Sequence, residues 1–250
     1  MKIGIFTSFQ NNKIVKQAIE SCKSIGVDYE VVDIINENWL DNVRNSDCDG
    51  FFCPSNCISQ ELKTIQDERY YFVSQVMKRP IYPDFNGLYI HENKRNMAAW
   101  LELNNYAHAK TKVFTNIENA INYLSDCEYP IVTKANVGAA ASKVRIVKNK
   151  RKAIRMAKKC LPKKFIFKLL SLGLFYKTKV GFLNLPDLHN PQKDYFIVQE
   201  FVKDILWEWR ILKIGDSYFG HQKLLEGQFA SGSGKVGWVA PPQHLLEMVR

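Results

Sequence analysis

The order of patterns in this sequence of 250 residues predicts an α/β fold. Segments rich in β-branched and aromatic residues alternate with segments of helical spacing through the first 90 residues, which favours a small parallel sheet with helices on both faces. Further strands follow around a small-residue loop at 129–147 and in a hairpin at 208–223. The sequence therefore predicts an α/β domain followed by α+β lobes.

The first 90 residues contain four expected strands and two expected helices. The strands are Lys2–Thr7, Tyr29–Ile34, Gly50–Cys53 and Pro80–Tyr82, and the helices are Asn12–Ser24 and Gln60–Met77. The loop Thr7–Asn11 after the first strand is polar and lacks the glycine fingerprint of dinucleotide sites. We therefore do not expect this domain to bind a dinucleotide. Asp84–Gly87 is typical of a turn.

The remainder of the chain is expected to form three helices, five strands and one segment without a clear pattern. The helices are Glu92–Ala107, Ile117–Leu124 (capped by Thr115 or Asn116) and Lys150–Cys160, and the strands are Tyr129–Lys134, Lys143–Val147, Ile197–Phe201, Glu208–Ile214 and Tyr218–Lys223. The last two strands form a hairpin, because Gly215-Asp216 is a strong turn dipeptide. Residues 161–194 are expected to form a lid or an insertion.

Composition favours a globular cytoplasmic protein, with 46% hydrophobic and 24% charged residues. The N-terminal residues form a first strand rather than a signal peptide. The most apolar later stretch, Phe165–Tyr176, is too short to cross a bilayer and is expected to be a buried helix or lid, with a membrane-surface helix as the alternative. The six cysteines are scattered, so we expect thiols of a reducing cytosol rather than a zinc site.

Charge is distributed unevenly along the chain. Residues 129–186 contain 15 lysines and arginines and no acidic residue, whereas the rest of the chain has 20 basic and 25 acidic residues. A basic lobe can attract ATP or another anionic substrate. Nucleic acid is the rival partner, but no binding motif is present and the aromatic residues do not interleave with the basic run. We therefore expect no nucleic acid partner.

Two lysines and a small-residue loop are the strongest signals of chemistry. Lys134 ends an otherwise apolar strand, where its ammonium group needs an anion or water. The loop Gly138–Ser142 follows, and small side chains allow backbone N–H groups to approach phosphate. Lys223 lies on the returning strand of the hairpin. These features suit a nucleoside triphosphate held between sheets, and the alternatives are a solvated lysine and an ordinary hairpin turn.

The ordered motifs PIVTK, GAAASKV, VQEF, EWR, IGDSYFGHQKL and FASGSG resemble those of the ATP-grasp ligases. The resemblance covers roughly the whole chain, most strongly 80–240, and is closest to ATP-grasp proteins of bacterial surface-polysaccharide loci. It implies an ATP-grasp architecture with a Rossmann-like pre-ATP-grasp domain at 1–90. A nucleotide-binding lid lobe with a helical lead-in would span 91–200, and the start of the C-terminal lobe 201–250.

The resemblance also implies roles for individual residues. Contacts to ATP fall on Lys94, Lys134, Gly138, Ala139, Ser142, Glu200, Phe201, Val202, Glu208 and Ser231. Within this set the backbone at Glu200 and Val202 would bind adenine, Glu208 would hold the ribose hydroxyls, and Ser231 lies in the acceptor loop. Arg210 and Lys223 would be catalytic, because they would meet the acyl phosphate and the γ-phosphate.

Departures from the family pattern concern the loops and the metal. Three alanines replace glycines at 139–141, Ala230 stands where arginine is common, and Lys223 stands where the family has arginine. Mg²⁺ is implied by the family, but its ligands lie downstream of the hairpin, and after Glu226 the only acidic residue is Glu247. We therefore assign no metal ligand and expect a fragment of a longer enzyme or an incomplete catalyst.

The expected function is ATP-dependent ligation of a carboxylate to an amine through an acyl phosphate, on a surface-glycan precursor or a peptide. The first alternative is a non-catalytic ATP-binding module, which the alanine-rich loop favours. The second is a basic nucleic-acid-binding protein. A second copy of the chain is retained as a candidate partner, and no transmembrane segment is expected.

Overall fold

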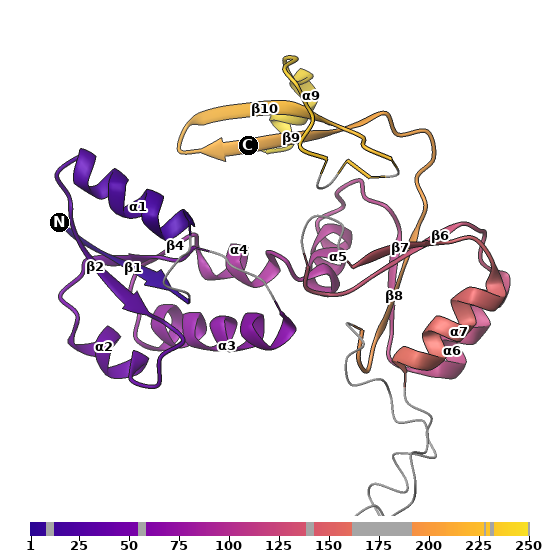
Figure 1. Cartoon of the computed structure of the whole chain (residues 1–250), viewed down its shortest axis with the longest axis horizontal. Coiled ribbons are helices and arrows are strands. Elements are labelled where there is room, and N and C mark those ends of the chain that lie inside the picture. Colours follow the sequence, from indigo (N-terminus) through magenta and orange to yellow (C-terminus); the bar gives the residue numbers. More distant parts are fainter. Residues whose placement is uncertain are drawn as a thin grey trace, which may run out of the picture. The chain divides into compact units, whose positions relative to one another are not determined.

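The computed structural model describes residues 1–8, 13–54, 59–138, 143–161, 192–227, 229–230 and 233–249 (Figure 1). The chain divides into two compact units, Met1–Tyr106 and Ala107–Arg250. The helix that leads into the expected lid lobe lies within the first unit. The division at residues 90 and 200 remains a prediction.

The first unit is built on a parallel sheet, as predicted. Its strands are β1 (Lys2–Thr7), β2 (Asp28–Asp33), β3 (Gly50–Phe52) and β4 (Ile81–Tyr82). They pair in the order β2-β1-β3-β4, and each neighbouring pair is parallel. Each strand begins and ends within one residue of its predicted bounds.

Five α-helices and one π-helical turn are described in this unit. They are α1 (Lys13–Ser24), α2 (Trp39–Asn45), α3 (Gln60–Tyr71), η1 (Phe72–Val76), α4 (Phe85–Ile90) and α5 (Lys94–Leu103). The predicted helix Gln60–Met77 is therefore α3 continued by η1. The sequence did not predict α2, because seven residues are too few to establish a helical period.

The predicted turn at Asp84 is wrong, because these residues begin α4. The Asp84 side chain accepts a hydrogen bond from the Gly87 N–H at 3.1 Å, as an N-cap does. Aspartate makes this local bond equally in turns and at helix starts, so the residue type alone does not decide between them. Burial of Leu88 in the core favours the helix here.

Successive side chains of β1 point to opposite faces of the sheet and enter two different cores. Ile5 packs with Val15 and Cys22 of α1 on one face of the sheet. Phe6 lies on the other face, where its ring stacks on Phe51 with the centroids 4.7 Å apart. Figure 1 shows α1 on one side of this sheet and α2 and α3 on the other. Helices therefore cover both faces, as the alternating pattern predicts.

An antiparallel sheet with two helices opens the second unit. Its strands are β5 (Thr111–Phe114), β6 (Ile131–Lys134), β7 (Val144–Val147) and β8 (Phe196–Glu200), in the order β5-β8-β6-β7. The helices are α6 (Ile117–Asp126) and α7 (Lys150–Cys160). Asn116 is the cap of α6, because its side chain accepts from the Asn119 N–H at 2.9 Å.

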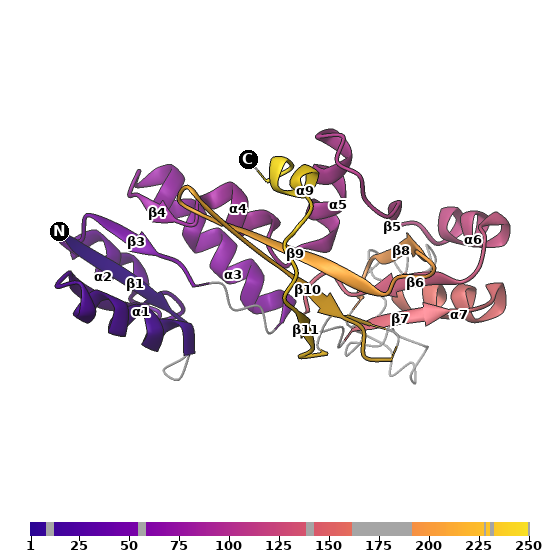
Figure 2. The same cartoon turned by 90° about the horizontal axis from the view of Figure 1, so that it is seen from above.

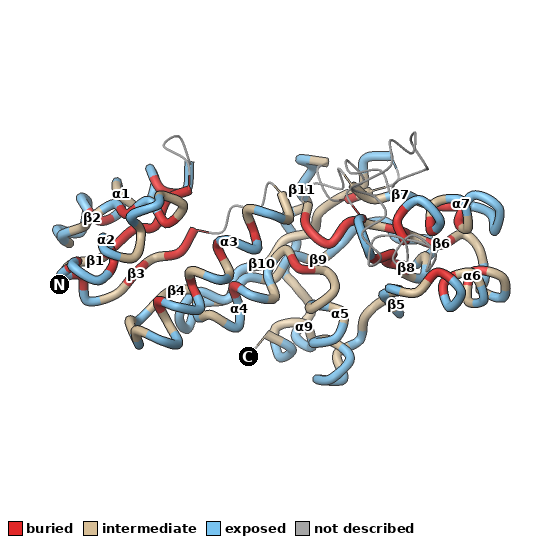
Figure 3. Tube along the Cα trace, turned by 90° about the horizontal axis from the view of Figure 1, so that it is seen from below, coloured by how far each residue is buried: buried red, intermediate tan, exposed pale blue. Residues whose placement is uncertain are grey.

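Both helices lie on the same face of this sheet. Ile131, Val147, Phe196 and Val198 point from the strands into a core with α6 and α7. Figures 1 and 2 both show the two helices side by side, and Figure 3 shows their buried residues against the strands. Residues at alternate positions, including Lys134, therefore lie on the opposite face.

The predicted hairpin is confirmed in a second, smaller sheet. It joins β9 (Trp207–Ile214) to β10 (Ser217–Leu224), and β11 (Val236–Gly237) pairs with β10. Gly215 has a φ of 56°, which suits the first central position of a two-residue hairpin turn. A short helix, α9 (Gln243–Glu247), follows.

Two predicted segments cannot be compared with the fold. Most of the expected lid or insertion, residues 162–191, and the apolar stretch Phe165–Tyr176 lie outside the described residues. Among the helices that the structure describes, none is long and apolar enough to cross a membrane.

Candidate functional site

A row of hydrogen-bonded polar side chains crosses the face of the antiparallel sheet that α6 and α7 leave uncovered. The Lys134 Nζ donates to Gln199 Oε1 at 2.7 Å, and the Gln199 Nε2 donates to Thr111 Oγ1 at 2.7 Å. These residues come from β6, β8 and β5. The amide of Gln199 is neutral, so this contact leaves the charge of the ammonium group intact.

The strand register explains why these side chains meet. Gln199 lies opposite Thr111 in one ladder and opposite Val132 in the next. Opposite residues share a face, and Lys134 is two positions beyond Val132 on the same strand. The sheet therefore presents a half-buried lysine beside a glutamine whose carbonyl accepts a hydrogen bond from it and whose NH₂ group can donate to a ligand. In this arrangement the lysine suits an anion, and the glutamine suits a polar ring adjacent to that anion.

The segment after Lys134 is buried and held in place. The Asn136 N–H donates to the Tyr195 hydroxyl at 2.8 Å, and Asn136 and Val137 are almost fully buried. The Ala135 N–H donates to the Lys143 carbonyl at 3.2 Å, which closes the hairpin between β6 and β7. The loop thus starts from a fixed base. Ala139 and Ser142 lie outside the described residues.

Gly138 is the last described residue before this loop, and its conformation favours glycine. Its φ is +153°, and a Cβ there would lie 3.1 Å from Lys143 Cδ. We predict that Gly138→Ala destabilises the second unit by about 1–3 kcal/mol, the usual cost of a strained backbone conformation. Thermal unfolding would measure it, with Gly87→Ala as a control because Gly87 has an ordinary φ. Equal melting temperatures for Gly138→Ala and the unmodified chain would contradict the strain.

The predicted adenine-binding linker begins at the end of β8. The Glu200 N–H donates to the Lys110 carbonyl at 2.9 Å, so this donor already serves the sheet. The Glu200 side chain is exposed and lies opposite Ile131, on the face covered by the helices. An adenine contact at Glu200 is therefore restricted to its carbonyl group. Val202 is exposed and Phe201 is half-buried.

Three predicted residues lie on one face of the hairpin sheet. Glu208 is directly opposite Lys223, and Arg210 is opposite His221. Because Arg210 is two positions from Glu208, all four side chains share a face. A Cβ at Gly220, on the other face, would collide with the ring of Pro241, which shows that a chain segment covers that other face. The carboxylate and the cations therefore stand together on the face opposite Pro241, where the ring of Trp238 lies 5.6 Å from that of His221.

Lys94 opens α5, as predicted, but lies in the first unit. Its Nζ is 2.8 Å from Glu92 Oε2, and both side chains are largely buried. The Asn93 side chain caps the helix by accepting from the Asn96 N–H at 3.3 Å. The lysine is thus held by a neighbouring carboxylate and a fixed helix start. Ser231, the predicted acceptor-loop residue, lies outside the described residues.

The sequence did not single out Gln199, Thr111 or His221. Gln199 belongs to the VQEF motif, but the sequence predicted the contact with ATP at the adjacent Glu200. Strand alternation alone does not reveal it, because the register of β8 beside β6 decides that Gln199 and not Glu200 faces the same way as Lys134. Thr111 belongs to β5, a four-residue strand that the sequence pattern did not reveal.

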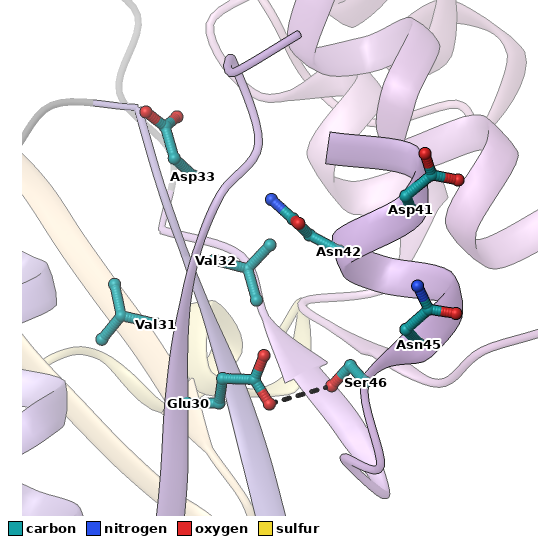
Figure 4. A pocket seen from close by; sticks show the side chains of 8 residues that line it. All are labelled: Glu30, Val31, Val32, Asp33, Asp41, Asn42, Asn45 and Ser46. Carbon is teal, nitrogen blue, oxygen red and sulfur yellow. Dashed lines mark hydrogen bonds between the residues drawn. The ribbon is translucent and has the colours of Figure 1, made fainter. Parts of the chain in front are cut away.

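The first unit contains an acidic pocket of about 390 Å³ between β2 and α2 (Figure 4). Its polar lining includes Glu30, Asp33, Asp41 and Ser46, and the Ser46 hydroxyl donates to Glu30 at 3.3 Å. None of the residues predicted from the sequence lines it. An acidic lining repels a triphosphate, so this pocket is unsuited to ATP.

One group of possible metal ligands occurs among the described residues, and it does not fit Mg²⁺. It consists of Glu30, Asp47 and Cys48. The Lys2 ammonium lies 3.0 Å from Glu30 and also bonds Asp47, which lowers the pKa of that carboxyl. Burial raises the pKa of the Cys48 thiol, and Mg²⁺ prefers oxygen ligands. The Lys2 ammonium therefore already pairs with both carboxylates of this cluster.

Solved structures resemble this chain over most of its length, although no protein-family model and no curated protein matches it. A RimK domain ATP-grasp protein from Sphaerobacter thermophilus superposes with a TM-score of 0.57 at 11% identity, covering 100% of this chain and 80% of that one. An N5-carboxyaminoimidazole synthase from Aspergillus clavatus, in complex with ADP and an aminoimidazole ribonucleotide, gives 0.55 at 11%, covering 91% and 55%.

A third solved structure resembles this chain with a similar TM-score and a similar identity. The phosphoribosylamine–glycine ligase from Thermotoga maritima gives a TM-score of 0.54 at 12% identity, covering 88% of this chain and 49% of the ligase. The chain thus spans about half the length of the last two enzymes. Identities this low establish the fold alone. The parallel sheet, the antiparallel sheet with its two helices and the hairpin sheet therefore give this chain the ATP-grasp fold.

Proposed function

We propose that this protein is an ATP-dependent ligase that joins a carboxylate to an amine. The observation that carries the proposal is the Lys134–Gln199–Thr111 row, on the sheet face away from α6 and α7, in a chain with the ATP-grasp fold. A lysine fixed beside an amide can hold a phosphate and the polar edge of a purine together. The fold is shared with an enzyme whose structure contains ADP, which supports the same ligand here.

The proposed reaction has two steps that balance in atoms and charge. A carboxylate oxygen attacks the γ-phosphorus of ATP, and the bond to the ADP oxygen breaks, which gives an acyl phosphate. The amine nitrogen then attacks the acyl carbon, phosphate leaves with the former carboxylate oxygen, and the nitrogen loses a proton. The protein contributes by positioning the reactants and neutralising charge.

In this proposal the antiparallel sheet holds the adenine and the first phosphates. Lys134 exchanges its bond to Gln199 for a bond to the α-phosphate. The carbonyl of Glu200 and the N–H of Val202 bind the adenine edge, with Phe201 against the ring. Backbone N–H groups at Gly138, Ala139 and Ser142 approach the β- and γ-phosphates.

The hairpin sheet supplies further proposed contacts. Glu208 accepts from the ribose hydroxyls, because a carboxylate suits two neighbouring O–H donors. Arg210 and Lys223 stabilise the acyl phosphate and the γ-phosphate, and Ser231 contacts the acceptor. The contact of Lys94 with ATP, which the resemblance implies, remains a prediction. A surface-glycan precursor or a peptide as substrate, a cytoplasmic location and a homodimer are further parts of this proposal. No step is assigned to Mg²⁺, because the one candidate metal group among the described residues does not fit it.

Trapping the acyl phosphate tests the proposed reaction directly. Hydroxylamine converts an acyl phosphate to a hydroxamate, so the chain is incubated with ATP, hydroxylamine and a panel of amino acids, peptides and sugar acids. We expect hydroxamate for at least one carboxylate, with transfer of one ¹⁸O from the labelled carboxylate to phosphate. Saturable ATP binding without hydroxamate or isotope transfer would instead identify the alternative, a non-catalytic ATP-binding module, which the alanines at 139–141 favour.

The assignment of Glu208 to the ribose gives a further prediction. Glu208→Ala should weaken ATP binding by about tenfold, in line with loss of a hydrogen bond to a charged group, and should leave binding of 2′,3′-dideoxy-ATP nearly unchanged. Isothermal calorimetry with both nucleotides measures this difference. Asp216→Ala in the hairpin turn is the matched control. The same loss for both nucleotides would refute ribose recognition.

A further inference from the structure

Helix α7 presents a face made only of basic residues. The exposed residues of this face, named here the basic face, are Arg151, Lys152, Arg155, Lys158 and Lys159. At about 100° per residue they fall within an arc of roughly 120° on the helix. Ala153, Ala157 and Cys160 lie on the opposite arc and are buried in the core. The helix is therefore anchored by one side and turns the other, fully cationic side to the surroundings.

The charge of the basic face is not compensated by ion pairs or by acidic residues in its own segment of the chain. Among the described residues, none of its five side chains takes part in an ion pair. Residues 129–186 contain no aspartate or glutamate at all. Arg145 on β7 and Lys148 before the helix are also exposed and extend the positive charge. Like charges at helical spacing repel one another, so this face costs folding stability unless an anionic partner meets it.

The basic face lies behind the proposed nucleotide site. Helix α7 packs through Val147 and Val198 against one face of the sheet, and the Lys134–Gln199 bond lies on the other. A nucleotide held by Lys134 is therefore separated from the basic face by the sheet itself. The cations of α7 therefore do not contact this nucleotide, and a different anionic partner would have to compensate their charge.

We propose that the basic face of α7 docks on the surface of an anionic lipid bilayer. Five cations along one side of a helix about 16 Å long can meet a plane of headgroups at the same time. The apolar side chains of α7 are used in the core, so the contact is electrostatic and does not insert into the bilayer. It would place the second unit of the chain at the membrane, with the sheet face of Lys134 turned away.

Nucleic acid fits this face less well. The basic face has no asparagine, glutamine, serine or threonine that could recognise base edges, and no aromatic residue that could stack on a base. Its arginines and lysines could contact phosphates or guanine edges, and nucleic acid is therefore the rival partner. The experiment below distinguishes nucleic acid from an anionic bilayer as the partner.

Vesicle binding by the full chain tests the proposal. Co-sedimentation is measured with vesicles of 30% phosphatidylglycerol in phosphatidylcholine and with pure phosphatidylcholine, at about 0.1 M and about 1 M NaCl. The variant Arg151→Gln/Arg155→Gln/Lys159→Gln removes three cations from one row of the helix. The control Lys13→Gln/Lys16→Gln/Lys23→Gln removes the same charge from exposed positions of α1.

We expect binding to the anionic vesicles only, and its loss at high salt as the screening length falls from about 10 Å to about 3 Å. The α7 variant should bind about 100-fold more weakly, at about fivefold per residue, and the α1 control should bind like the unmodified chain. If the circular dichroism of the triple variant shows that it is misfolded, the single variant Arg155→Gln tests the proposal instead. Its binding to anionic vesicles is expected to be about fivefold weaker.

Three outcomes overturn the proposal. The first is equal binding to both kinds of vesicle. The second is equal loss in the α7 and α1 variants, which would show that only net charge matters. The third is α7-dependent binding to a 30-base-pair nucleic acid duplex without any preference for anionic vesicles, which would identify nucleic acid as the partner.

Discussion

Replacement of Lys134 by alanine is expected to weaken ATP binding by about 10- to 150-fold, equivalent to about 1.5–3 kcal/mol for a charge-assisted hydrogen bond. The ammonium group is held 2.7 Å from Gln199 on a buried sheet, so it is already placed for a phosphate and loses little side-chain freedom on binding. Isothermal calorimetry of the full chain with ATP measures the change.

The matched control for this prediction is Lys112→Ala. Lys112 lies on β5 of the same sheet, on the helix side, where its ammonium is 4.7 Å from the centre of the Tyr123 ring. Removing it changes net charge by the same amount without touching the sheet face that carries Lys134. Unchanged ATP affinity in Lys134→Ala, or equal losses in both variants, would show that Lys134 does not contact the nucleotide.

Removal of the Asp67 carboxylate is expected to be the most damaging single change in the first unit. Its partner Lys63 is only 3% exposed, and the Lys63 Nζ bonds Asp67 and also donates to the Leu88 carbonyl at 3.1 Å. Asp67→Ala leaves a buried ammonium without its counter-ion, which typically costs about 3–5 kcal/mol. Hydrogen exchange of peptides from 60–90 measures this loss separately from the second unit.

Replacing both partners should have a much smaller effect. Burial raises the pKa of the Asp67 carboxyl, so the cost of removing this charge from water exceeds what Lys63 returns to it. Lys63→Met/Asp67→Leu removes both desolvated charges and keeps the packing volume, and we expect it to be nearly neutral or stabilising. A double variant as unstable as Asp67→Ala would contradict this account and assign the loss to altered packing in α3.

Local sequence patterns predict most of the regular elements here. The bounds of β1 and α7 are predicted to the residue, because strand alternation and helical spacing are strong in these segments. The hairpin follows from Gly215-Asp216, since few residues other than glycine adopt the required positive φ. The patterns fail for α4, where the same aspartate chemistry begins either a turn or a helix.

The candidate site is predictable only in part, because its partners come together through the sheet. The sequence identifies Lys134 as a lysine ending an apolar strand, and this position is as predicted. Gln199 is 65 residues away from Lys134 along the chain, and Thr111 is 88 residues away from Gln199. Neither has a local pattern that marks it, and the strand β5 that carries Thr111 has only four residues.

The sequence by itself determined the types and order of most elements, with α2, α4 and β5 among the exceptions, the basic character of α7 and the motifs that resemble the ATP-grasp ligases. Only the tertiary structure decided which side chains share a face. The register of β8 between β5 and β6 turns Gln199 toward Lys134 and Glu200 toward the helices, since neighbours on a strand point to opposite faces. The packing of α7 places its cations on the far side of the same sheet. Pairing between distant strands and burial against distant helices fix these choices, and no local propensity encodes them.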